Sequence, residues 1–366
     1  MTVTTRGRLA GAASLLLAAS AAFVIGASSP AGADVTVTTE AELRAAFADT
    51  SETLIELTAD LTIACDGDNQ MFRLGAGQAD LVIDGNGHQI TFPCNDGNEA
   101  IFVNDDVGAT ITLRDITLVD TGSGYAAAVT DGPLIVESAT IVGWADALRG
   151  DTIVMTGSYV RDATGAAVRP DEGAVIRNST VAGNVSAVAA DGEVVLENST
   201  FTGSTGAALL LRNAQATLTH VTLAGNATHL SLVESSLTST AVAYGPSSGA
   251  PCDFGGGPVT SGGYNLAAGA CDLEGATDQA GLGGGAFALS ALGGDGPALR
   301  PGAGSVLVDA IPAGECALAA DQVGTARPLG EGCEVGSIEV VPTAAPPAAP
   351  PAPPAAPAPA APRFTG

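Results

Sequence analysis

The amino-acid sequence predicts an all-β fold, a single-stranded right-handed parallel β-helix, and three observations support this prediction. Six segments between Leu113 and Leu223 align in one frame with a period of about 20 residues, which is typical of stacked-repeat proteins. The segments are rich in Val, Ile and Thr, which favour strands. Glycine accounts for 48 of the 366 residues, as expected of a chain with many tight turns. The aligned segments read LRDITL, VESATI, MTGSYV, IRNSTV, LENSTF and LTHVTL.

Each repeat is predicted to consist of three short strands separated by three bends. Two apolar columns, which begin at Leu113 and Leu118, mark two of the strands, and residues that bend a chain or bond to its backbone lie between them. A third apolar column, which includes Val129 and Val168, precedes an acidic turn. The column between the first two contains Asp115, Ser138, Gly157, Asn178, Asn198 and His220.

A leucine-rich repeat, which contains helical segments, is the alternative for a period of this length. The alternation of side chains argues against it, because Val194 and Leu196 are expected on one side of a strand and Val195 and Glu197 on the other. The fixed spacing of Leu and Asn in a leucine-rich repeat is also absent. We therefore expect strands and turns.

Residues 1–33 are predicted to be a signal peptide. Arg6 and Arg8 precede an apolar run over residues 9–25, and small residues follow as a cleavage site, so cleavage is expected before Asp34. A transmembrane helix is the alternative, but the run is terminal, Ala-rich and followed by that site. No segment of the mature chain is apolar enough to span a bilayer. We expect a secreted protein, either extracellular or associated with the cell envelope.

The mature chain is predicted to divide into four regions. Residues 34–53 form an N-terminal cap, in which residues 39–48 form an amphipathic helix over the open end of the β-helix. Residues 54–245 form the β-helix, with room for about nine coils. Residues 246–340 form a loop-rich, Gly-rich and disulfide-containing C-terminal cap, and residues 341–366 form a Pro/Ala-rich spacer.

Six cysteines are consistent with an oxidising compartment and allow fifteen pairings. Two of them end the similar runs LTIAC and ITFPC, and equivalent positions on stacked coils are about 4.8 Å apart, close enough for a bridge. The other four are expected to pair with their neighbours in sequence. A zinc site is the alternative, but there is no CxxC motif and the three His are scattered. The expected pairs are Cys65–Cys94, Cys252–Cys271 and Cys316–Cys333.

The charge of the chain restricts its partners. All 13 basic residues are Arg, and 39 acidic residues give a formal net charge of -26. Such a surface repels nucleic acid and anionic lipid, and it repels a polyanionic glycan unless cations bridge the two. The composition is also that of a highly soluble protein or of one from a saline habitat.

Three segments of the chain resemble those of a known family. They are LVIDGNGHQITF (residues 81–92), GGYNLAAGACDL (residues 262–273) and DQVGTARPLGEGCEVGSIE (residues 321–339). They resemble the opening coil and the closing region of secreted β-helix proteins of the choice-of-anchor Q group, which are related to polymorphic outer-membrane protein repeats. The likeness covers most of the mature chain and implies a secreted β-helix. The group's pattern has Arg, Asp, Ile and Ala where this chain has Val323, Glu334, Val335 and Ser337.

A charged group around the only Trp is the best candidate for a glycan-binding surface. A Trp ring can stack on a sugar, carboxylates can serve as acids, bases or Ca²⁺ ligands, and Arg can bind a uronic acid. The alternative is that Arg149 and Arg169, aligned on adjacent coils, form ordinary surface ion pairs with Asp151 and Asp171. The candidate residues are Trp144, Asp146, Arg149, Asp151, Arg161, Asp162, Arg169 and Asp171.

A row of aspartates is the only candidate metal site. Asp131, Asp151, Asp171 and Asp191 recur every twenty residues at the acidic turn, and acidic turns about 4.8 Å apart can share Ca²⁺. Alternatively, each Asp bonds to its own turn, and Asn213 at the next position favours this. We therefore expect no cofactor, with Ca²⁺ as the one candidate.

No acid pair in a recognisable motif is present, so no catalytic residue is predicted. The expected function is a non-catalytic adhesive, structural or glycan-binding role at the cell surface or in the medium. The partner is expected to be a glycan of the cell envelope or the environment, or a surface protein, and the protein is expected to be a monomer. The alternative is a polysaccharide lyase or another carbohydrate-active enzyme, such as a glycosidase, centred on residues 144–171.

Overall fold

The computed structural model describes residues 33–340, apart from residues 66–71, 75, 76, 79, 96–99, 106, 107, 293–297 and 303. The predicted signal peptide (residues 1–33) and the predicted Pro/Ala-rich tail (residues 341–366) lie outside the described residues, with the exception of Ala33. Within the described part of the chain, no helix has the length and apolar character needed to cross a membrane.

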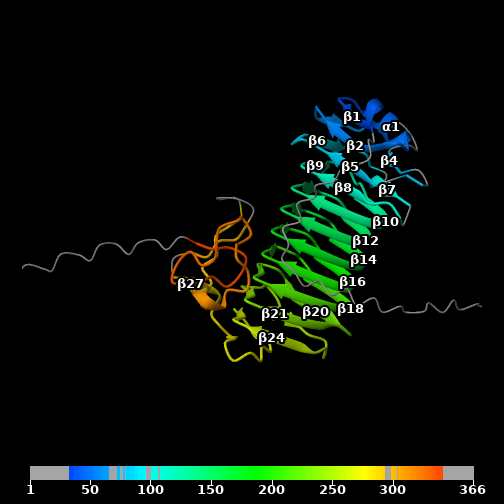
Figure 1. Cartoon of the computed structure of the whole chain (residues 1–366). Helices are drawn as coiled ribbons and strands as arrows, with labels where there is room; N and C mark the ends of the chain where they lie inside the picture. Colours follow the sequence, from blue (N-terminus) through cyan, green and yellow to red (C-terminus); the bar gives the residue numbers. More distant parts are fainter. Residues whose placement is uncertain are drawn as a thin grey trace, which may run out of the picture. The chain divides into compact units, whose positions relative to one another are not determined.

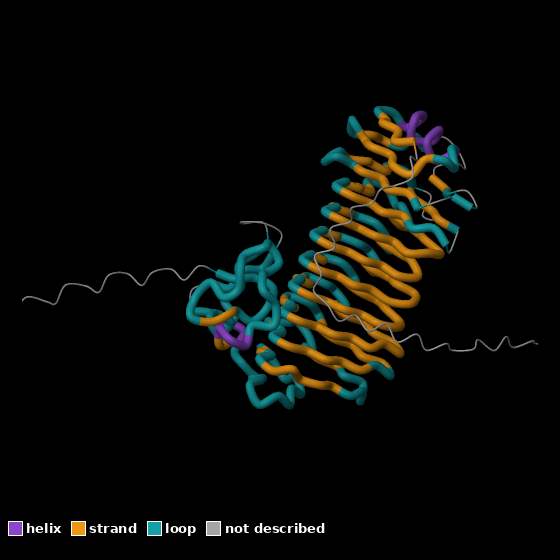
Figure 2. Tube along the Cα trace, in the orientation of Figure 1, coloured by secondary structure: helices purple, strands orange, loops and turns teal. Residues whose placement is uncertain are grey.

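The chain forms a parallel β-solenoid, which confirms the predicted all-β fold (Figure 1). Two large sheets, sheet A with 15 strands and sheet B with 10, consist of parallel strand pairs. Sheet B contributes one short strand to each coil, so there are about ten coils, one more than the sequence predicts. Strands dominate the solenoid and loops dominate the C-terminal part of the chain (Figure 2).

Sheet A follows two sides of each coil. Its strands are β1 (Ala33–Val37), β2 (Glu52–Leu57), β4 (Phe72–Arg73), β5 (Leu81–Asp84), β7 (Ala100–Asn104), β8 (Ile111–Arg114), β10 (Ala126–Glu137), β12 (Leu148–Thr156), β14 (Ala166–Arg177), β16 (Ser186–Glu197), β18 (Ala207–Thr219), β20 (Thr228–Val233), β21 (Ser236–Thr240), β23 (Cys252–Asp253) and β24 (Val259–Gly263).

Sheet B forms the third side. Its strands are β3 (Leu61–Thr62), β6 (Gln89–Phe92), β9 (Thr117–Asp120), β11 (Thr140–Val142), β13 (Tyr159–Arg161), β15 (Thr180–Ala182), β17 (Thr200–Thr202), β19 (Thr222–Ala224), β22 (Ala243–Tyr244) and β25 (Leu266–Ala267). The remaining elements are the helix α1 (Glu40–Ala48), the 3₁₀ turns η1 (Gly284–Ala286) and η2 (Ala313–Glu315), and the antiparallel pair β26 (Ile311–Pro312) and β27 (Gly332–Cys333).

The long strands of sheet A each cover two sides of a coil because they bend at the acidic turn. β18 pairs with β20 through its first half and with β21 through its second half. The register between β12 and β14 shifts between Gly150 and Thr152, next to Asp151. Each coil therefore has the three strands and three bends that the repeat predicts.

The bend column of the sequence lies at the corner between sheet A and sheet B. All six of its residues have positive φ, from 45° at Asn198 to 60° at Gly157. Gly adopts this left-handed conformation without strain, and Asn and Asp tolerate it better than other residues. The position after this corner is a serine in three consecutive coils, where the hydroxyls of Ser158, Ser179 and Ser199 are buried and accept backbone N–H groups of the preceding coil.

The helix α1 covers the N-terminal end of the solenoid core. A capping box starts it, in which the Glu42 N–H donates to the Thr39 hydroxyl (3.2 Å) and the Thr39 N–H donates to the Glu42 carboxylate (3.0 Å). Its buried face includes Phe47, whose ring lies 5.3 Å from the ring of Phe72 and 5.6 Å from that of Phe102. The predicted capping helix is thus present.

The solenoid extends beyond residue 245, where the sequence predicts its end. β23, β24 and β25 pair in parallel with β20, β21 and β22 and form a further coil. Their strands are short and the connecting segment is Gly-rich, so the apolar pattern of the repeat is too weak here to reveal them. Phe254 and Leu273 pack against the end of the core.

The closing motif, residues 321–339, does not cover the end of the solenoid as a terminal cap does. It lies against the outer side of sheet B, where Gln322 bonds Thr180 and Thr200 at 2.7 Å each. Part of the predicted C-terminal cap is therefore a lateral attachment to the middle coils.

Three disulfides join the six cysteines in the expected pairs, Cys65–Cys94, Cys252–Cys271 and Cys316–Cys333. The first pair lies just beyond β3 and β6, with Cα atoms 5.5 Å apart, so it links two adjacent coils. Since every cysteine is bonded, none is left to bind zinc.

Candidate functional site

Trp144 is not part of a surface, and the prediction that it stacks on a sugar is wrong. Its side chain is completely buried in the solenoid core, and its ring lies 5.4 Å from the ring of Phe92. The residue follows the positive-φ bend at Gly143, and the residues that follow the same bend in the next coils, Ala163 and Asn184, are also buried. The repeat therefore places this position inside, whatever residue occupies it.

Two of the candidate arginines lie side by side on the outer face of sheet A. Arg149 on β12 pairs in register with Arg169 on β14, so their Cα atoms are about one strand spacing, roughly 4.8 Å, apart. The neighbouring Leu148 and Val168 point into the core, which directs both arginines outward. Arg169 is exposed and Arg149 is half-buried.

Each arginine is held by a partner that the surface ion-pair alternative did not name. The Arg149 guanidinium donates to the Tyr125 hydroxyl (2.7 Å), and this hydrogen bond raises the pKa of Arg149. The Arg169 guanidinium forms an ion pair with Asp146 (2.6 Å) rather than with Asp171. The arginine pair is thus fixed in place by Tyr125 and Asp146.

Asp146 positions Arg169 and is not an open acid. The carboxylate is buried, its Oδ1 accepts the Ala166 N–H (2.9 Å), and its Oδ2 accepts the Arg169 guanidinium. Its burial and its ion pair with Arg169 thus give this carboxylate a positioning role beneath the arginine pair.

Tyr125 is the residue of this surface that the sequence did not reveal. Its ring is half-buried against a small outer apolar cluster of Ala100, Val103 and Ala126. It lies between the second and third apolar columns of the repeat, and no second aromatic residue marks its column. The one available signal was its position one coil before Asp146, whose N–H donates to the Tyr125 carbonyl (2.8 Å).

A small hollow of about 80 Å³ adjoins Arg169 of the pair. Arg169 and Asp171 line it from one coil, Asp191 from the next and Arg212 from a third, and the side chains of Ala189 and Leu210 also line it. We name the surface around it, formed by Tyr125, Asp146, Arg149, Arg169, Asp171 and Arg212, the arginine face.

Arg161 and Asp162 lie on a different side of the coil. They belong to sheet B and its following bend, where they form an ion pair (2.5 Å) and Arg161 lies 5.9 Å from the centre of the Tyr159 ring. A separate hollow of about 340 Å³ adjoins them and is also lined by Leu292. The predicted surface is therefore divided among the core, the outer face of sheet A and the outer face of sheet B.

The aspartate row lies at the turns of sheet A. Asp131, Asp171 and Asp191 are exposed and Asp151 is half-buried. Over the described ranges of the chain, no three His, Cys, Asp or Glu side chains gather closely enough to hold a metal ion. The described structure thus gives no ligand set for the Ca²⁺ that the row suggested.

The first part of the solenoid is similar to a known family. Residues 34–140 match the family described as "Putative pectate lyase-like adhesive domain". The match covers α1, the first coils and β10, and it includes Tyr125 but neither arginine of the pair. No curated protein matches the sequence significantly.

Two solved structures are similar to this chain. The L. reuteri 53608 SRRP is 15% identical, with a TM-score of 0.43, and the alignment covers 62% of this chain and 95% of that one. The L. reuteri 100-23 SRRP is 16% identical, with a TM-score of 0.47, and the alignment covers 65% of this chain and 79% of that one. The family similarity of this chain thus lies in residues 34–140, which match a pectate lyase-like adhesive domain.

Proposed function

We propose that the protein is an exported, non-catalytic adhesin that binds a carboxylate-bearing glycan through the arginine face. The observation that carries this proposal is the in-register pair of outward guanidinium groups, fixed by Tyr125 and Asp146. Guanidinium groups that are already fixed before the ligand binds lose less conformational entropy on binding a carboxylate than mobile ones do. The match of residues 34–140 to an adhesive domain supports an adhesive role.

Export is supported by the three disulfides, because such bonds persist in oxidising compartments. A repeat scaffold also suits adhesion, since stacked coils present side chains in straight rows. The polysaccharide lyase alternative is less favoured, because the carboxylate beside the arginines is buried and paired with Arg169 rather than exposed to a substrate.

The test is a binding and turnover assay of the full mature chain with acidic and neutral polysaccharides, with and without calcium. We expect the wild-type protein to bind an acidic glycan without cleaving it. The Arg149→Gln/Arg169→Gln variant should bind at least tenfold more weakly, because each charge-assisted hydrogen bond contributes about 1.5–3 kcal/mol.

Arg177→Gln is the matched control, since Arg177 is another outer arginine of β14 but pairs with Glu197 away from the arginine face. The control should bind as the wild type does. Equal binding by all three proteins would refute the site, and release of unsaturated sugar ends by the wild type would refute the non-catalytic role.

A further inference from the structure

The closing motif is fastened to a row of threonines on sheet B. Thr180, Thr200 and Thr222 occupy equivalent positions on β15, β17 and β19 and are buried, although their side chains point away from the core. Gln322 bonds the first two, and the Ser337 hydroxyl lies 2.8 Å from that of Thr200 and 3.2 Å from that of Thr222. We name residues 321–339 the strap.

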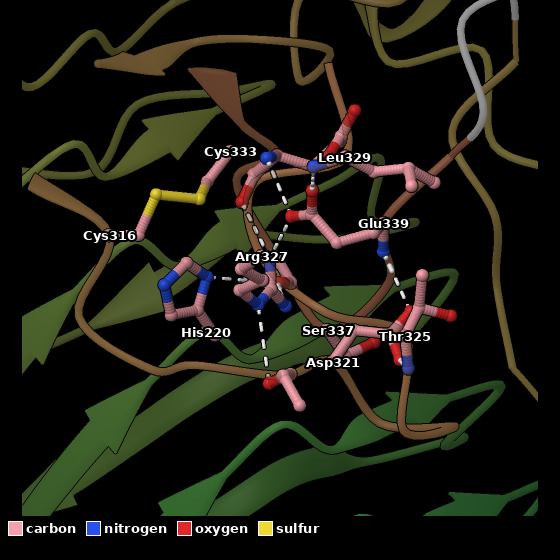
Figure 3. A network of polar contacts seen from close by, with 12 residues as sticks. His220, Cys316, Asp321, Thr325, Arg327, Leu329, Cys333, Ser337 and Glu339 are labelled. Atoms are coloured by element: carbon pink, nitrogen blue, oxygen red, sulfur yellow. Dashed lines mark hydrogen bonds and ion pairs between the residues drawn. A yellow bond between two sulfur atoms is a disulfide. The ribbon is translucent and has the colours of Figure 1, made fainter. Parts of the chain in front are cut away.

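An ionic centre lies within the strap, completely inside the protein (Figure 3). Arg327 forms an ion pair with Glu339, and neither side chain is exposed. The same guanidinium donates to the carbonyl groups of Gly336 (3.0 Å) and Glu334 (3.2 Å) and to the side chain of Asn198 (3.3 Å). Arg327 thus joins the strap to itself and to the solenoid.

The carboxyl groups around this one cation outnumber it. Glu339, Glu334 and Asp321 are all buried, and Asp309 also acts on Glu334 electrostatically. The carboxylate of Asp321 accepts N–H groups of Val323, Thr325 and Glu339, so its charge is compensated by the backbone.

Glu334 has no such compensation. Among the described residues, neither of its side-chain oxygens has a hydrogen-bond partner, and its neighbour is the carboxyl group of Glu339. His220, the other titratable group here, brings no positive charge, because burial and Arg327 lower its pKa to about 3. An ionised Glu334 would therefore add a second buried negative charge beside a cation that Glu339 already neutralises.

We propose that residues 321–339 form a proton-dependent strap, which stays closed over the threonine row of sheet B while Glu334 is neutral and opens when Glu334 becomes charged. In the closed form, the neutral Glu334 carboxyl can donate its proton to Glu339, which an ionised carboxylate cannot do. Opening removes the carboxyl groups from the interior and uncovers Thr180, Thr200 and Thr222. The disulfide Cys316–Cys333 keeps the open strap attached to the segment that follows η2.

The direction of the pH dependence follows from the same geometry. Burial, followed by the neighbouring carboxyl group of Glu339, raises the pKa of Glu334 to about 9, whereas a solvated Glu in the open strap titrates at about 4.3. The closed strap therefore holds one more proton than the open strap between these two values. The opening constant should rise by up to about tenfold for each pH unit in this window and be constant above it.

Hydrogen exchange of the full mature chain with its disulfides intact, measured from pH 5 to pH 9.5, tests the proposal. The reporting amides are those of Gln322, Ser337 and Glu339, which donate within the strap and to Thr222. After division by the unstructured exchange rate at each pH, these amides should exchange faster as pH rises. The amides of β16, in the solenoid, should not.

Glu334→Gln keeps a neutral side chain and should abolish the pH dependence, so that the wild type exchanges at least 100-fold faster than this variant at pH 9. Glu331→Gln, an exposed carboxyl of the same segment, should behave as the wild type does. A wild-type strap whose corrected exchange is independent of pH would overturn the proposal even if Glu334→Gln did not fold. So would a rise shared equally by β16, since that shows global unfolding.

Discussion

The side chain of Trp144 fills the core beside Gly124, and this contact leaves no room for a side chain at Gly124. A Cβ atom at Gly124 would lie 2.5 Å from Cζ3 of Trp144 and 3.1 Å from Cδ1 of Phe92. Gly124→Ala should therefore lower the free energy of unfolding by about 1–3 kcal/mol, measured by denaturant unfolding. Combined with Trp144→Phe, which makes room, the loss should be smaller than the sum of the single losses.

Gly283→Ala is the control for this cycle, because no atom of the described residues lies within 4 Å of its added Cβ and its φ is negative. It should change the stability by less than about 0.5 kcal/mol. Additive effects of Gly124→Ala and Trp144→Phe would show that the two residues do not interact as the structure has them.

The sequence placed the bend residues correctly and Trp144 incorrectly, for one physical reason. Asp115, Asn178 and Asn198 are recognisable because few residue types tolerate positive φ, so the backbone requirement leaves a mark on composition. The position that follows the bend after each sheet B strand, at Gly143 and Gly225, is also buried, but residues as different as Trp144 and Asn226 occupy it. A column without a shared residue type gives no sequence signal for its burial.

At the level of elements, the capping box of α1 determines where the only α-helix in the described ranges begins. This helix covers the end of the core at the first coils. Thr39→Ala removes the hydroxyl that accepts the Glu42 N–H and should cost about 1 kcal/mol of helix stability. The Leu43 amide, which donates to the Thr39 carbonyl, should then exchange about fivefold faster with deuterium.

Thr164→Ala, at an exposed loop position between β13 and β14, is the control and should leave the exchange of α1 unchanged. If Thr39→Ala also left it unchanged, the packing of Phe47 on Phe72 and Phe102 would hold α1 without the capping box.

Local patterns predicted the coils but not the attachment of the strap. Strand and bend columns arise within one coil of about 20 residues, so a single frame reveals them. Gln322 instead bonds Thr180 across 142 positions, and no periodicity links such distant segments. The likeness of residues 321–339 to a closing region identified the segment without showing which side of the solenoid it contacts.

For the molecule as a whole, buried titratable groups of opposite effect determine how stability depends on pH. Burial lowers the pKa of His220 to about 3 and that of His229 to about 4. The unfolded chain, in which His titrates at about 6.5, therefore binds up to two more protons than the folded chain as pH falls below that value. Stability should decrease by up to about 3 kcal/mol per pH unit on this acid side.

Glu334 acts in the opposite sense, because its raised pKa makes the folded chain bind one more proton between about 4.3 and 9. Its contribution to stability is greatest at low pH and decreases as pH rises, by about 1.4 kcal/mol per unit. Of His220, His229 and Glu334, only Glu334 makes stability depend on pH above 6.5. Below pH 6.5, the two histidines have the larger effect. The free energy of unfolding should therefore be greatest near pH 6.5.

Urea unfolding from pH 4.5 to pH 9 tests this balance with two variants that change opposite sides of the profile. His220→Asn suits the positive φ that Asn178 and Asn198 adopt in the same column, and it removes one titrating group. It should reduce the slope on the acid side by about 1.4 kcal/mol per pH unit and leave the alkaline side unchanged. Glu334→Gln should flatten the alkaline side, and it should steepen the acid side because nothing then opposes the histidines.

A wild-type profile whose maximum lies below pH 5 would show instead that repulsion among the 39 acidic residues outweighs the buried groups.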